Sequence, residues 1–585
     1  MQCQFLSTGY LFRKQKKTAL FIAGLLLLLS SPAMPGEFIT IPEYFYQIDH
    51  SKKLILVNED ISRINGSVSG TKKGLLLDEY YRLPDEPATL KVGMPYLVSG
   101  TDSAIYTLYF TRLPIIEINT PNTIADKPRV LADFSMSAPD GTVFHSQMGI
   151  EIRGGHSQSY PKTSFRIEFW EDPTEADTLT RDFSLLGMRN DDDWNLQAMY
   201  NEPLRIRNKT SFQLWEQIHQ LYYHELEPDA SGGVQMEYAE LFLNGEYRGL
   251  YAVGERIDRK QLQLKKYDGS IRGELYKGIS WGATTFSDIP EFQNKDLIWG
   301  GFEYIFPEER IDWLNLFGFV DFAVNEDDYF FYSDYPSYFH TDNAVDYFIF
   351  LNLLRASDNT GKNIYTARYD QGEPYFYVPW DLDGVLGLWW DGTNDDKTTH
   401  ILTNGLFDRL LGDCRENGFY KKLQNRWFSL RKVILSHKNI MSLVQENVDF
   451  LLMNGVYERE ELAWNEYGFS IQHLDYISGW LTGRLSWLDN EFNKNCVPPG
   501  EFSFDDPKPR IELYPNPATE HLDIKIGAGA LPFEIQIFNL SGYLHYTGKV
   551  RSKEHSFNLP PLKPGLYFVV IGNAAFTETQ KLIIR

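Results

Sequence analysis

Residues 358–384 read DNTGKNIYTARYDQGEPYFYVPWDLDG, a β-hairpin pattern with acidic and amide residues at its two ends. Asn363–Arg368 and Tyr375–Val378 are typical of strands, and the Asp-Gln-Gly run between them is typical of a turn. Antiparallel pairing would bring Asn363 and Asp381 to the same end of the ribbon, where neighbouring strands lie about 5 Å apart. Oxygen atoms of both residues could then reach one divalent cation.

Two further carboxylates flank this pair, since Asp358 lies on the loop before Asn363 and Asp383 follows Asp381. Protein kinases present a catalytic Asp, a metal-binding Asn and a metal-binding Asp in this order. The pattern predicts a phosphoryl-transfer site, with Asp358 as the catalytic residue and Asn363, Asp381 and Asp383 as metal ligands. Two alternatives remain open, because Asp, Asn and Gly favour turns whatever the function and oxygen-rich clusters also suit a calcium-stabilised loop.

Cationic residues that could hold phosphates lie upstream. A Gly-rich run after Arg153 precedes a segment in which Phe165, Ile167 and Phe169 fall on one face of a strand. The opposite face then carries Lys162 and Arg166, so that a Gly-rich loop and a basic strand face could cover and neutralise phosphates. The alternative is a plain turn followed by a half-exposed edge strand.

A helix and a hairpin follow this strand. Asn201-Glu202-Pro203 is a typical helix start. In a kinase the corresponding helix supplies the acidic partner of the phosphate-binding lysine, so Glu202 and Glu216 are both candidates for the partner of Lys162. Asn244-Gly245, between two strand-like runs, predicts a type I′ hairpin. Glu255 comes directly after it and is a candidate for the adenine hinge or for the cap of the next helix.

Length and charge limit the classes of function. The chain has 585 residues, more than one hydrophobic core usually organises, so we expect several domains. The formal net charge of −23 makes nucleic-acid binding improbable, because the surface field repels phosphate backbones. An anionic nucleotide would need a local basic pocket or bound Mg²⁺.

The chain divides at changes of composition. Residues 1–36 have the basic, apolar and small-residue plan of a secretory signal peptide, and no other stretch is long and apolar enough for a transmembrane segment in the mature chain. We expect a β-rich domain at 37–112, a mixed central domain at 113–495, a Pro-rich linker at 496–510 and a small β-sandwich at 511–585. Pairing of Cys414 with Cys496 is left open.

The central domain resembles the CotH kinase family, which comprises atypical protein kinases that are secreted or belong to the spore coat. The resemblance is carried by Arg153-Gly154-Gly155-His156-Ser157, Pro161-Lys162-Thr163-Ser164-Phe165-Arg166, Asn244-Gly245-Glu246-Tyr247-Arg248-Gly249-Leu250-Tyr251 and Pro379-Trp380-Asp381-Leu382-Asp383. It implies an α+β, two-lobed kinase-like fold that uses ATP with Mg²⁺ or Mn²⁺. Carried over to this chain, it implies Lys162 at phosphate, Asp358 as catalytic Asp, and Asn363 and Asp381 at the metal.

The C-terminal segment resembles the sorting domain of proteins exported by the type IX secretion system of Bacteroidetes. The resemblance is carried by Tyr514-Pro515-Asn516-Pro517-Ala518, Asn539-Leu540-Ser541-Gly542 and Leu562-Lys563-Pro564-Gly565-Leu566-Tyr567. It implies the secretion machinery as a partner and a secreted or cell-surface location. The sequence thus favours a secreted kinase that phosphorylates hydroxyls of an extracytoplasmic protein. The alternative is a catalytically inactive CotH fold with a surface, structural or adhesion role.

Overall fold

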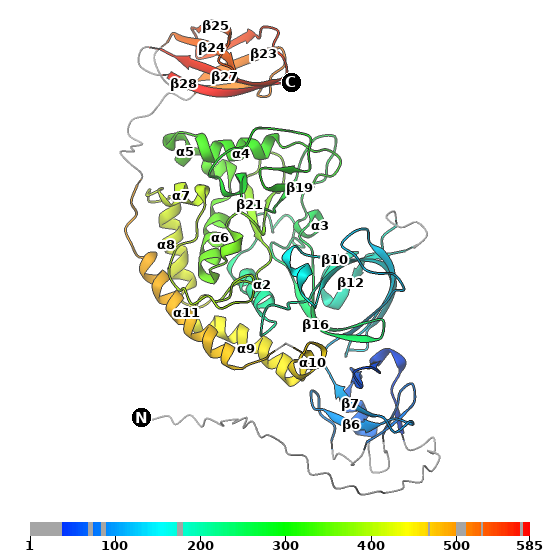
Figure 1. The fold of residues 1–585 in the computed structure, drawn as a ribbon. Coiled ribbons are helices and arrows are strands. Elements are labelled where there is room, and N and C mark those ends of the chain that lie inside the picture. Colours follow the sequence, from blue (N-terminus) through cyan, green and yellow to red (C-terminus); the bar gives the residue numbers. More distant parts are fainter. Residues whose placement is uncertain are drawn as a thin grey trace, which may run out of the picture.

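The computed structural model describes residues 38–67, 74–83, 89–171, 179–465, 468–498, 511–527, 531–573 and 577–585. The predicted signal peptide and residues 499–510 of the predicted linker lie outside the described residues. Helices and strands alternate through a mixed α+β arrangement, with a β-rich region at each end of the chain (Figure 1). Among the described residues, no helix combines the length and the apolar character needed to cross a bilayer.

The first region is a seven-stranded sheet, which we call the N-terminal sheet. Its strand order is β1-β4-β5-β6-β7-β3-β2, and helix α1 (Ile61–Ser67) follows β3. The alternating apolar residues of the central strands, such as Ile55, Val57 and Leu108, form its buried core. Its strands are β1 (Phe38–Thr40), β2 (Tyr46–Asp49), β3 (Leu54–Val57), β4 (Gly74–Leu76), β5 (Tyr80–Arg82), β6 (Tyr96–Ser99) and β7 (Ile105–Phe110).

A closed seven-stranded barrel follows, in the order β10-β11-β14-β16-β15-β8-β9. Phe165, Ile167 and Phe169 of β11 point into its core, as their alternation predicted. Because β11 pairs with β10 on one side and β14 on the other, the edge-strand alternative is wrong. The strands are β8 (Ile115–Asn119), β9 (Val130–Ser137), β10 (Val143–Arg153), β11 (Ser164–Trp170), β14 (Asp193–Gln197), β15 (Met236–Leu243) and β16 (Glu246–Gly254). A separate two-stranded ribbon, β12 (Phe183–Ser184) and β13 (Asn190–Asp191), packs Phe183 against the barrel core.

The hairpin between β15 and β16 is confirmed. Asn244 and Gly245 both have positive φ, at 52° and 74°, as a type I′ turn requires. The helix start predicted at Asn201-Glu202-Pro203 is wrong by several residues, because α2 spans Arg207–Ile218. The Glu202 carboxylate instead accepts the backbone N–H groups of Leu204 at 2.9 Å and Arg207 at 3.3 Å, so it caps α2 from the preceding turn.

The rest of the central region is a five-stranded antiparallel sheet surrounded by helices (Figure 1). The sheet order is β18-β19-β17-β20-β21, and Ile364 of β20 pairs with Pro379 of β21, so the hairpin predicted from residues 358–384 is confirmed. The strands are β17 (Glu274–Gly278), β18 (Ile298–Trp299), β19 (Phe302–Phe306), β20 (Ile364–Arg368) and β21 (Tyr375–Pro379). The helices are α3 (Arg259–Leu262), α4 (Leu314–Asn325), α5 (Asp328–Tyr338), α6 (Thr341–Leu354), α7 (Gly405–Leu411), α8 (Phe419–Leu430), α9 (His437–Met453), α10 (Val456–Ala463) and α11 (Gln472–Glu491).

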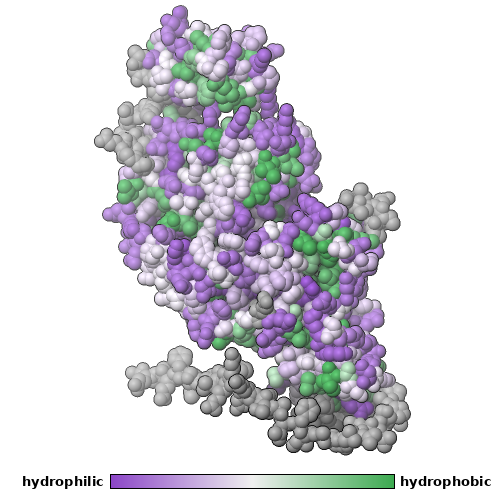
Figure 2. All heavy atoms as spheres, viewed as in Figure 1, coloured by the Kyte–Doolittle hydropathy of each residue, from purple (hydrophilic) through white to green (hydrophobic). Residues whose placement is uncertain are grey.

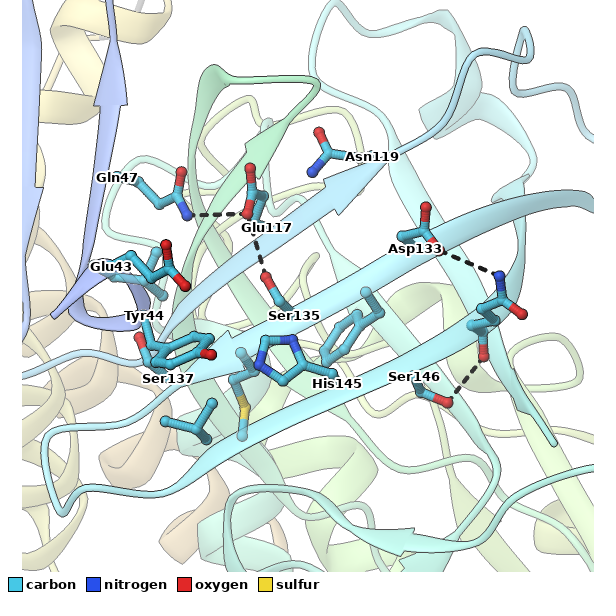
Figure 3. Close-up of a pocket in the computed structure, with 15 residues that line it drawn as sticks. Glu43, Tyr44, Gln47, Glu117, Asn119, Asp133, Ser135, Ser137, His145 and Ser146 are labelled. Carbon is cyan, nitrogen blue, oxygen red and sulfur yellow. Dashed lines mark hydrogen bonds between the residues drawn. The ribbon is translucent and has the colours of Figure 1, made fainter. Parts of the chain in front are cut away.

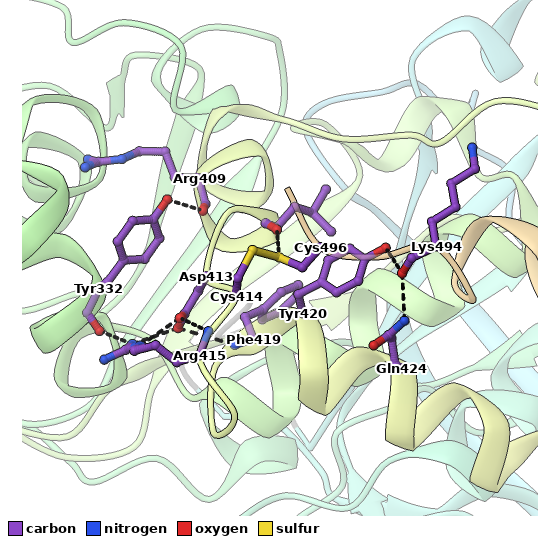
Figure 4. Close-up of a disulfide and its surroundings, with 11 residues drawn as sticks. Tyr332, Arg409, Asp413, Cys414, Arg415, Phe419, Tyr420, Gln424, Lys494 and Cys496 are labelled. Carbon is purple, nitrogen blue, oxygen red and sulfur yellow. Dashed lines mark hydrogen bonds and ion pairs between the residues drawn. A yellow bond between two sulfur atoms is a disulfide. The ribbon is translucent and has the colours of Figure 1, made fainter. Parts of the chain in front are cut away.

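Cys414 and Cys496 form a disulfide, with their Cα atoms 5.5 Å apart (Figure 4). The bond ties the loop between α7 and α8 to the chain that leaves α11. Next to it, the Asp413 carboxylate pairs with Arg415 at 2.7 Å and accepts the Tyr335 hydroxyl at 3.1 Å. The pairing that the sequence left open is therefore made, and it secures the end of the helical region just before the C-terminal strands begin.

The C-terminal region consists of a three-stranded and a four-stranded antiparallel sheet that share one apolar core. The predicted β-sandwich therefore agrees with the structure. Lys581 of this region pairs with Asp321 on α4. Polar residues cover most of the visible face of the whole molecule and hydrophobic patches are small (Figure 2). The strands are β22 (Ile511–Tyr514), β23 (His521–Ile526), β24 (Phe533–Asn539), β25 (Leu544–Val550), β26 (Glu554–Asn558), β27 (Gly565–Gly572) and β28 (Thr577–Ile584).

Candidate active site

A cavity of about 440 Å³ lies between the barrel and the open end of the β20–β21 hairpin. It collects residues that are far apart in sequence: the end of β10, the approach to β11, the loop before β20 and the loop after β21. Six of the eight residues predicted for the site line it: Arg153, Lys162, Asp358, Asn363, Asp381 and Asp383.

Asp358 sits on a single 3₁₀ turn, Ser357–Asn359. Its Oδ2 accepts the amide of Asn363 at 2.8 Å and lies 3.3 Å from the Lys362 ammonium. Burial raises the pKa of Asp358, and the negative charge of Asp381 adds to the rise, while Lys362 and Asn363 oppose it. A half-buried carboxylate held by an amide and an ammonium suits a group that accepts a proton from a hydroxyl.

The loops on both sides of the hairpin are held by one buried side chain, Asn359. Its amide donates to the backbone carbonyl of Asn363 at 2.9 Å and to that of Trp380 at 2.6 Å. The backbone carbonyl of Asn359 accepts the Tyr347 hydroxyl at 2.9 Å. These bonds hold Asn363 and Asp381 at neighbouring ends of β20 and β21, which is the arrangement that two residues binding one ligand would need.

Asp383 is anchored from the turn before α2. The Asn201 amide donates to Asp383 Oδ2 at 3.3 Å and to the Trp390 carbonyl at 2.6 Å. From α2 itself, Asn208 Oδ1 accepts the Leu382 N–H at 3.1 Å. Burial, followed by the charge of Asp381, raises the pKa of Asp383 to about 7.

The residue types that line the cavity suit a divalent cation such as Mg²⁺ or Mn²⁺, although the three carboxylates do not all lie within 4.8 Å of one another, as those of Asp182, Asp191 and Asp192 do. Three carboxylates, on Asp358, Asp381 and Asp383, and the amide of Asn363 give a set of oxygen donors, which such cations prefer. Burial is the main cause of the raised pKa values of Asp358 and Asp383, and the negative charge of Asp381 adds to both, so Asp381 repels each of them. A cation between them would offset that repulsion.

Lys162 is fully buried, and its acidic partner comes from the far end of the chain. Its ammonium donates to the Glu460 carboxylate on α10 at 2.8 Å and to the Leu250 carbonyl at 2.6 Å. Neither Glu202 nor Glu216, the candidates from sequence, is that partner: Glu202 caps α2 and pairs with Arg207, and Glu216 is exposed. Burial lowers the pKa of Lys162 to about 8, although Glu460 works against that change.

The pair formed by Lys162 and Glu460 also completes the edge of β16. Pairing of β14 with β16 ends at Ala252, so the Leu250 backbone lacks a strand partner on that side. Lys162 supplies a donor to the Leu250 carbonyl, and Glu460 accepts the Leu250 N–H at 2.6 Å. Gly249 permits this approach, because its φ is +86° and a Cβ there would lie 2.0 Å from Glu460.

Aromatic side chains surround the opening of the cavity. Trp281 and Trp390 line it with 53 % and 46 % of their surface exposed. His156 lies edge-on to Trp390, with ring centres 5.0 Å apart, and the Arg153 guanidinium lies 5.5 Å from the ring centre of Trp380. The opening therefore offers flat apolar faces above a charged interior.

Arg166 and Glu255 do not line this cavity. Arg166 pairs with Asp193, its Nε lying 3.0 Å from Asp193 Oδ1, in an ion-pair cluster on the barrel. Glu255 is buried and accepts the backbone N–H of Gln235 and the amide of Gln261, both at 3.2 Å. Both residues thus have structural partners elsewhere. The next helix, α3, is capped by Asp258 rather than by Glu255.

A second cavity, of about 600 Å³, lies where the N-terminal sheet meets the outer face of the barrel (Figure 3). Glu43 and Tyr44 face Glu117, Asp133 and His145, which project outward from the barrel strands. The described residues that line it include three carboxylates and neither Lys nor Arg. Such a lining repels phosphates, so the first cavity is the better candidate for nucleotide chemistry.

The sequence did not point to Asn201, Asn208, Asn359 or Glu460. The three Asn side chains hydrogen-bond to the backbone or to a carboxylate of the site, and such contacts leave no periodic pattern in the sequence. Glu460 is 298 residues from Lys162 and belongs to a helix rich in charges, which looks like a solvated surface helix in sequence. The only available signal was the need of a buried lysine for a charged partner.

Comparisons with known proteins agree with the resemblances seen in the sequence. The family model described as CotH kinase protein matches residues 150–488, more than half of the chain. The model described as secretion system C-terminal sorting domain matches residues 512–585 and indicates export by the type IX machinery to the cell surface or beyond. No curated protein matches the chain. The chain is therefore a member of the CotH kinase protein family that carries a C-terminal secretion sorting domain.

Proposed function

We propose that the chain is an exported kinase that transfers the γ-phosphate of ATP to hydroxyl groups of an extracytoplasmic protein. The observation that carries this proposal is the convergence of Asp358, Asn363, Asp381 and Asp383 in one cavity that Lys162 and Arg153 also line. Phosphoryl transfer needs mainly positioning and charge stabilisation, and this set contains groups for both.

Each residue has a definite task in this scheme. Asp358 accepts the proton of the acceptor hydroxyl, and the Asn363 amide at 2.8 Å keeps its carboxylate oriented. Asp381, Asp383 and Asn363 hold the divalent cation, which neutralises phosphate charge when bound. Lys162 and Arg153 balance the remaining phosphate charge from the barrel side. Because Lys162 is fully covered and engaged by Glu460 and Leu250, its task also depends on that pair keeping its position.

The alternative is a catalytically inactive CotH fold that acts as a surface or structural protein. The exposed Trp281 and Trp390 at the cavity opening favour it, because they would suit binding without chemistry. Both proposals predict a folded and exported protein. They differ in whether a nucleotide binds in a cation-dependent way.

Calorimetric titration of the whole mature protein with a non-hydrolysable ATP analogue, with and without Mg²⁺, tests the proposal. We expect binding that requires Mg²⁺ and that Asp381→Asn weakens at least tenfold. Asp391→Asn is the matched control, because Asp391 is exposed near the opening and, within the described part of the chain, its carboxylate bonds only to Thr393. Absence of binding in the wild type would favour the inactive alternative, and equal affinity in Asp381→Asn would exclude this residue as a metal ligand.

A further inference from the structure

Helix α10 carries two adjacent charged residues that are both fully buried. Arg459 and Glu460 each have 0 % of their side-chain surface exposed. Glu460 pairs with Lys162 and, through its other oxygen, with Arg205 at 3.0 Å. Buried charges are costly unless paired, so the place of this short helix is fixed by the partners of both residues.

Arg459 fixes the helix to the barrel and to the N-terminal sheet. Its guanidinium pairs with Glu240 on β15, which also accepts the hydroxyl of Tyr247. The same guanidinium lies 5.0 Å from the ring centre of Tyr109, in the last strand of the N-terminal sheet. It also donates to the Asn454 carbonyl at 2.7 Å, and so holds the turn from which α10 starts.

That turn is packed directly on the N-terminal sheet and its exit (Figure 1). Asn454 Oδ1 accepts the Arg112 N–H at 2.6 Å. Gly93 and Gly455 both have positive φ, and their backbones touch: a Cβ on Gly93 would lie 2.2 Å from the Met453 carbonyl, and one on Gly455 would lie 2.4 Å from the Gly93 carbonyl. A side chain at either position would push the sheet and the turn apart.

We propose that the N-terminal sheet is a positioning module for the cavity: its contact with the turn at Asn454 and Gly455 sets α10, and α10 sets Glu460 against Lys162. Asn454, Arg459 and Glu460 are positioning residues in this chain of contacts. The consequence for nucleotide binding rests on the proposed function. The link from the sheet to Glu460 does not, because it is made of contacts within the protein.

The test uses two variants at the contact between the N-terminal sheet and the turn before α10. Gly93→Ala forces the turn away, and Asn454→Ala removes the bond to Arg112 without adding bulk. The matched control is Gly141→Ala, because Gly141 also has positive φ, at 92°, but a Cβ there meets nothing within 4 Å. Glu458→Gln is a second control, since Glu458 is an exposed residue of α10 next to Arg459.

The first readout is amide hydrogen exchange of the peptide containing Leu250, measured on the whole mature protein without nucleotide. The Leu250 N–H is held by Glu460, so we expect its exchange to be at least tenfold faster in Gly93→Ala and in Asn454→Ala, and unchanged in both controls. The second readout is the affinity for the ATP analogue with Mg²⁺, which should fall about tenfold in the same two variants.

Unchanged Leu250 exchange in both Gly93→Ala and Asn454→Ala would overturn the proposal, even if their melting temperatures drop. Faster exchange in a protein that binds no nucleotide would uphold the positioning link and reject the proposed function. Faster exchange with unchanged affinity would overturn the assignment of the sheet to the nucleotide site. The two ideas therefore fail by different measurements.

Discussion

Asn363 and Asp381 both lie at the open end of one hairpin, just outside the paired residues Ile364 and Pro379, and both have left-handed backbones, with φ of 53° and 57°. This conformation is costly for residues other than Gly, although Asn and Asp bear it better than most. Strained positions that persist next to a charged cavity are typical of functional sites. The hairpin and its two end residues are the structural basis of the predictions below.

Replacing Asn363 separates its backbone role from its role as a ligand. Asn363→Gly removes the amide but relieves the positive φ, so we expect stability near the wild type and loss of most metal affinity. Asn363→Ala should lose the same affinity and also about 1 kcal/mol of stability. Thermal melting and Mn²⁺ titration measure the two effects. Wild-type Mn²⁺ affinity in Asn363→Gly would exclude this residue as a ligand.

Asn359 does not line the cavity, but its replacement should lower both stability and activity. Asn359→Ala leaves the carbonyls of Asn363 and Trp380 without their donor, which costs about 1–3 kcal/mol of folding free energy. We expect phosphate transfer to fall with it, because both loops that carry the proposed metal ligands loosen. Asn490→Ala is the control, since Asn490 is exposed and donates only to Ser486. Equal urea midpoints for the two variants would contradict this role.

Gly249 and Gly245 lie in one hairpin and test the approach of Glu460. Both have positive φ, but only a Cβ on Gly249 meets Glu460, at 2.0 Å. We expect Gly245→Ala to cost about 1 kcal/mol and Gly249→Ala at least about 3 kcal/mol, because the second also displaces a buried ion pair. Chemical denaturation measures both. Similar losses of unfolding free energy in the two variants would show that Glu460 can move away from residue 249 at little cost.

The pH dependence of nucleotide binding should report on Lys162, whose pKa is lowered to about 8. The ammonium loses its proton as the pH rises through that value, so affinity for the ATP analogue should be about tenfold weaker at pH 9 than at pH 7. The contribution of Lys162 to folding stability, in contrast, increases as the pH rises through this range. Because the folded pKa lies below the unfolded one, the cost of the buried charge is present below pH 8 and is relieved as the pH rises above it.

Lys162→Met supplies the comparison for this pH profile. It removes the charge, so the variant should bind weakly at both pH values and show no step between them. The Mg²⁺ concentration is kept the same at each pH, and the Lys162→Met profile corrects for titration of the nucleotide itself. A flat profile in the wild type up to pH 9 would mean that Lys162 keeps its proton or does not act on the phosphates.

The disulfide should stabilise the helical region without taking part in chemistry. It spans 82 residues, so the double variant Cys414→Ser/Cys496→Ser should lose about 2–4 kcal/mol. A reducing agent should lower the melting temperature of the wild type to that of the variant and leave the variant unchanged. A reducing agent without effect on the wild type would mean that the bond is not formed in the protein.

The sequence predicted the parts of the fold that depend on local chemistry. Alternating strands, Asn-Gly and the Asp-Gln-Gly turn determined both hairpins, and the second hairpin placed Asn363 beside Asp381. The partner of Lys162 was not predictable, because Glu460 meets it only through packing of a distant helix. Arg166 was proposed from its place on the polar face of a strand and Glu255 from its place after the first hairpin, but Asp193 engages Arg166 and the amide of Gln261 engages Glu255 instead.

The start of α2 shows the same limit on a smaller scale. Asn201 and Glu202 both looked like parts of a helix start, but the chain uses Asn201 to hold Asp383 and Glu202 to cap the helix from a distance. A local signal identified the region correctly and misplaced the boundary, because the cavity competes for the same side chains. Residues with two uses are those that sequence patterns describe least well.

Transfer of labelled γ-phosphate from ATP by the whole mature protein, with Mg²⁺ and a protein acceptor, tests the central claim most directly. We predict labelling by the wild type, a loss of about 100-fold or more in Asp358→Asn with unchanged melting temperature, and full labelling in the control Asp391→Asn. No labelling by the wild type with Mg²⁺ or Mn²⁺, or equal labelling by Asp358→Asn, would contradict the account.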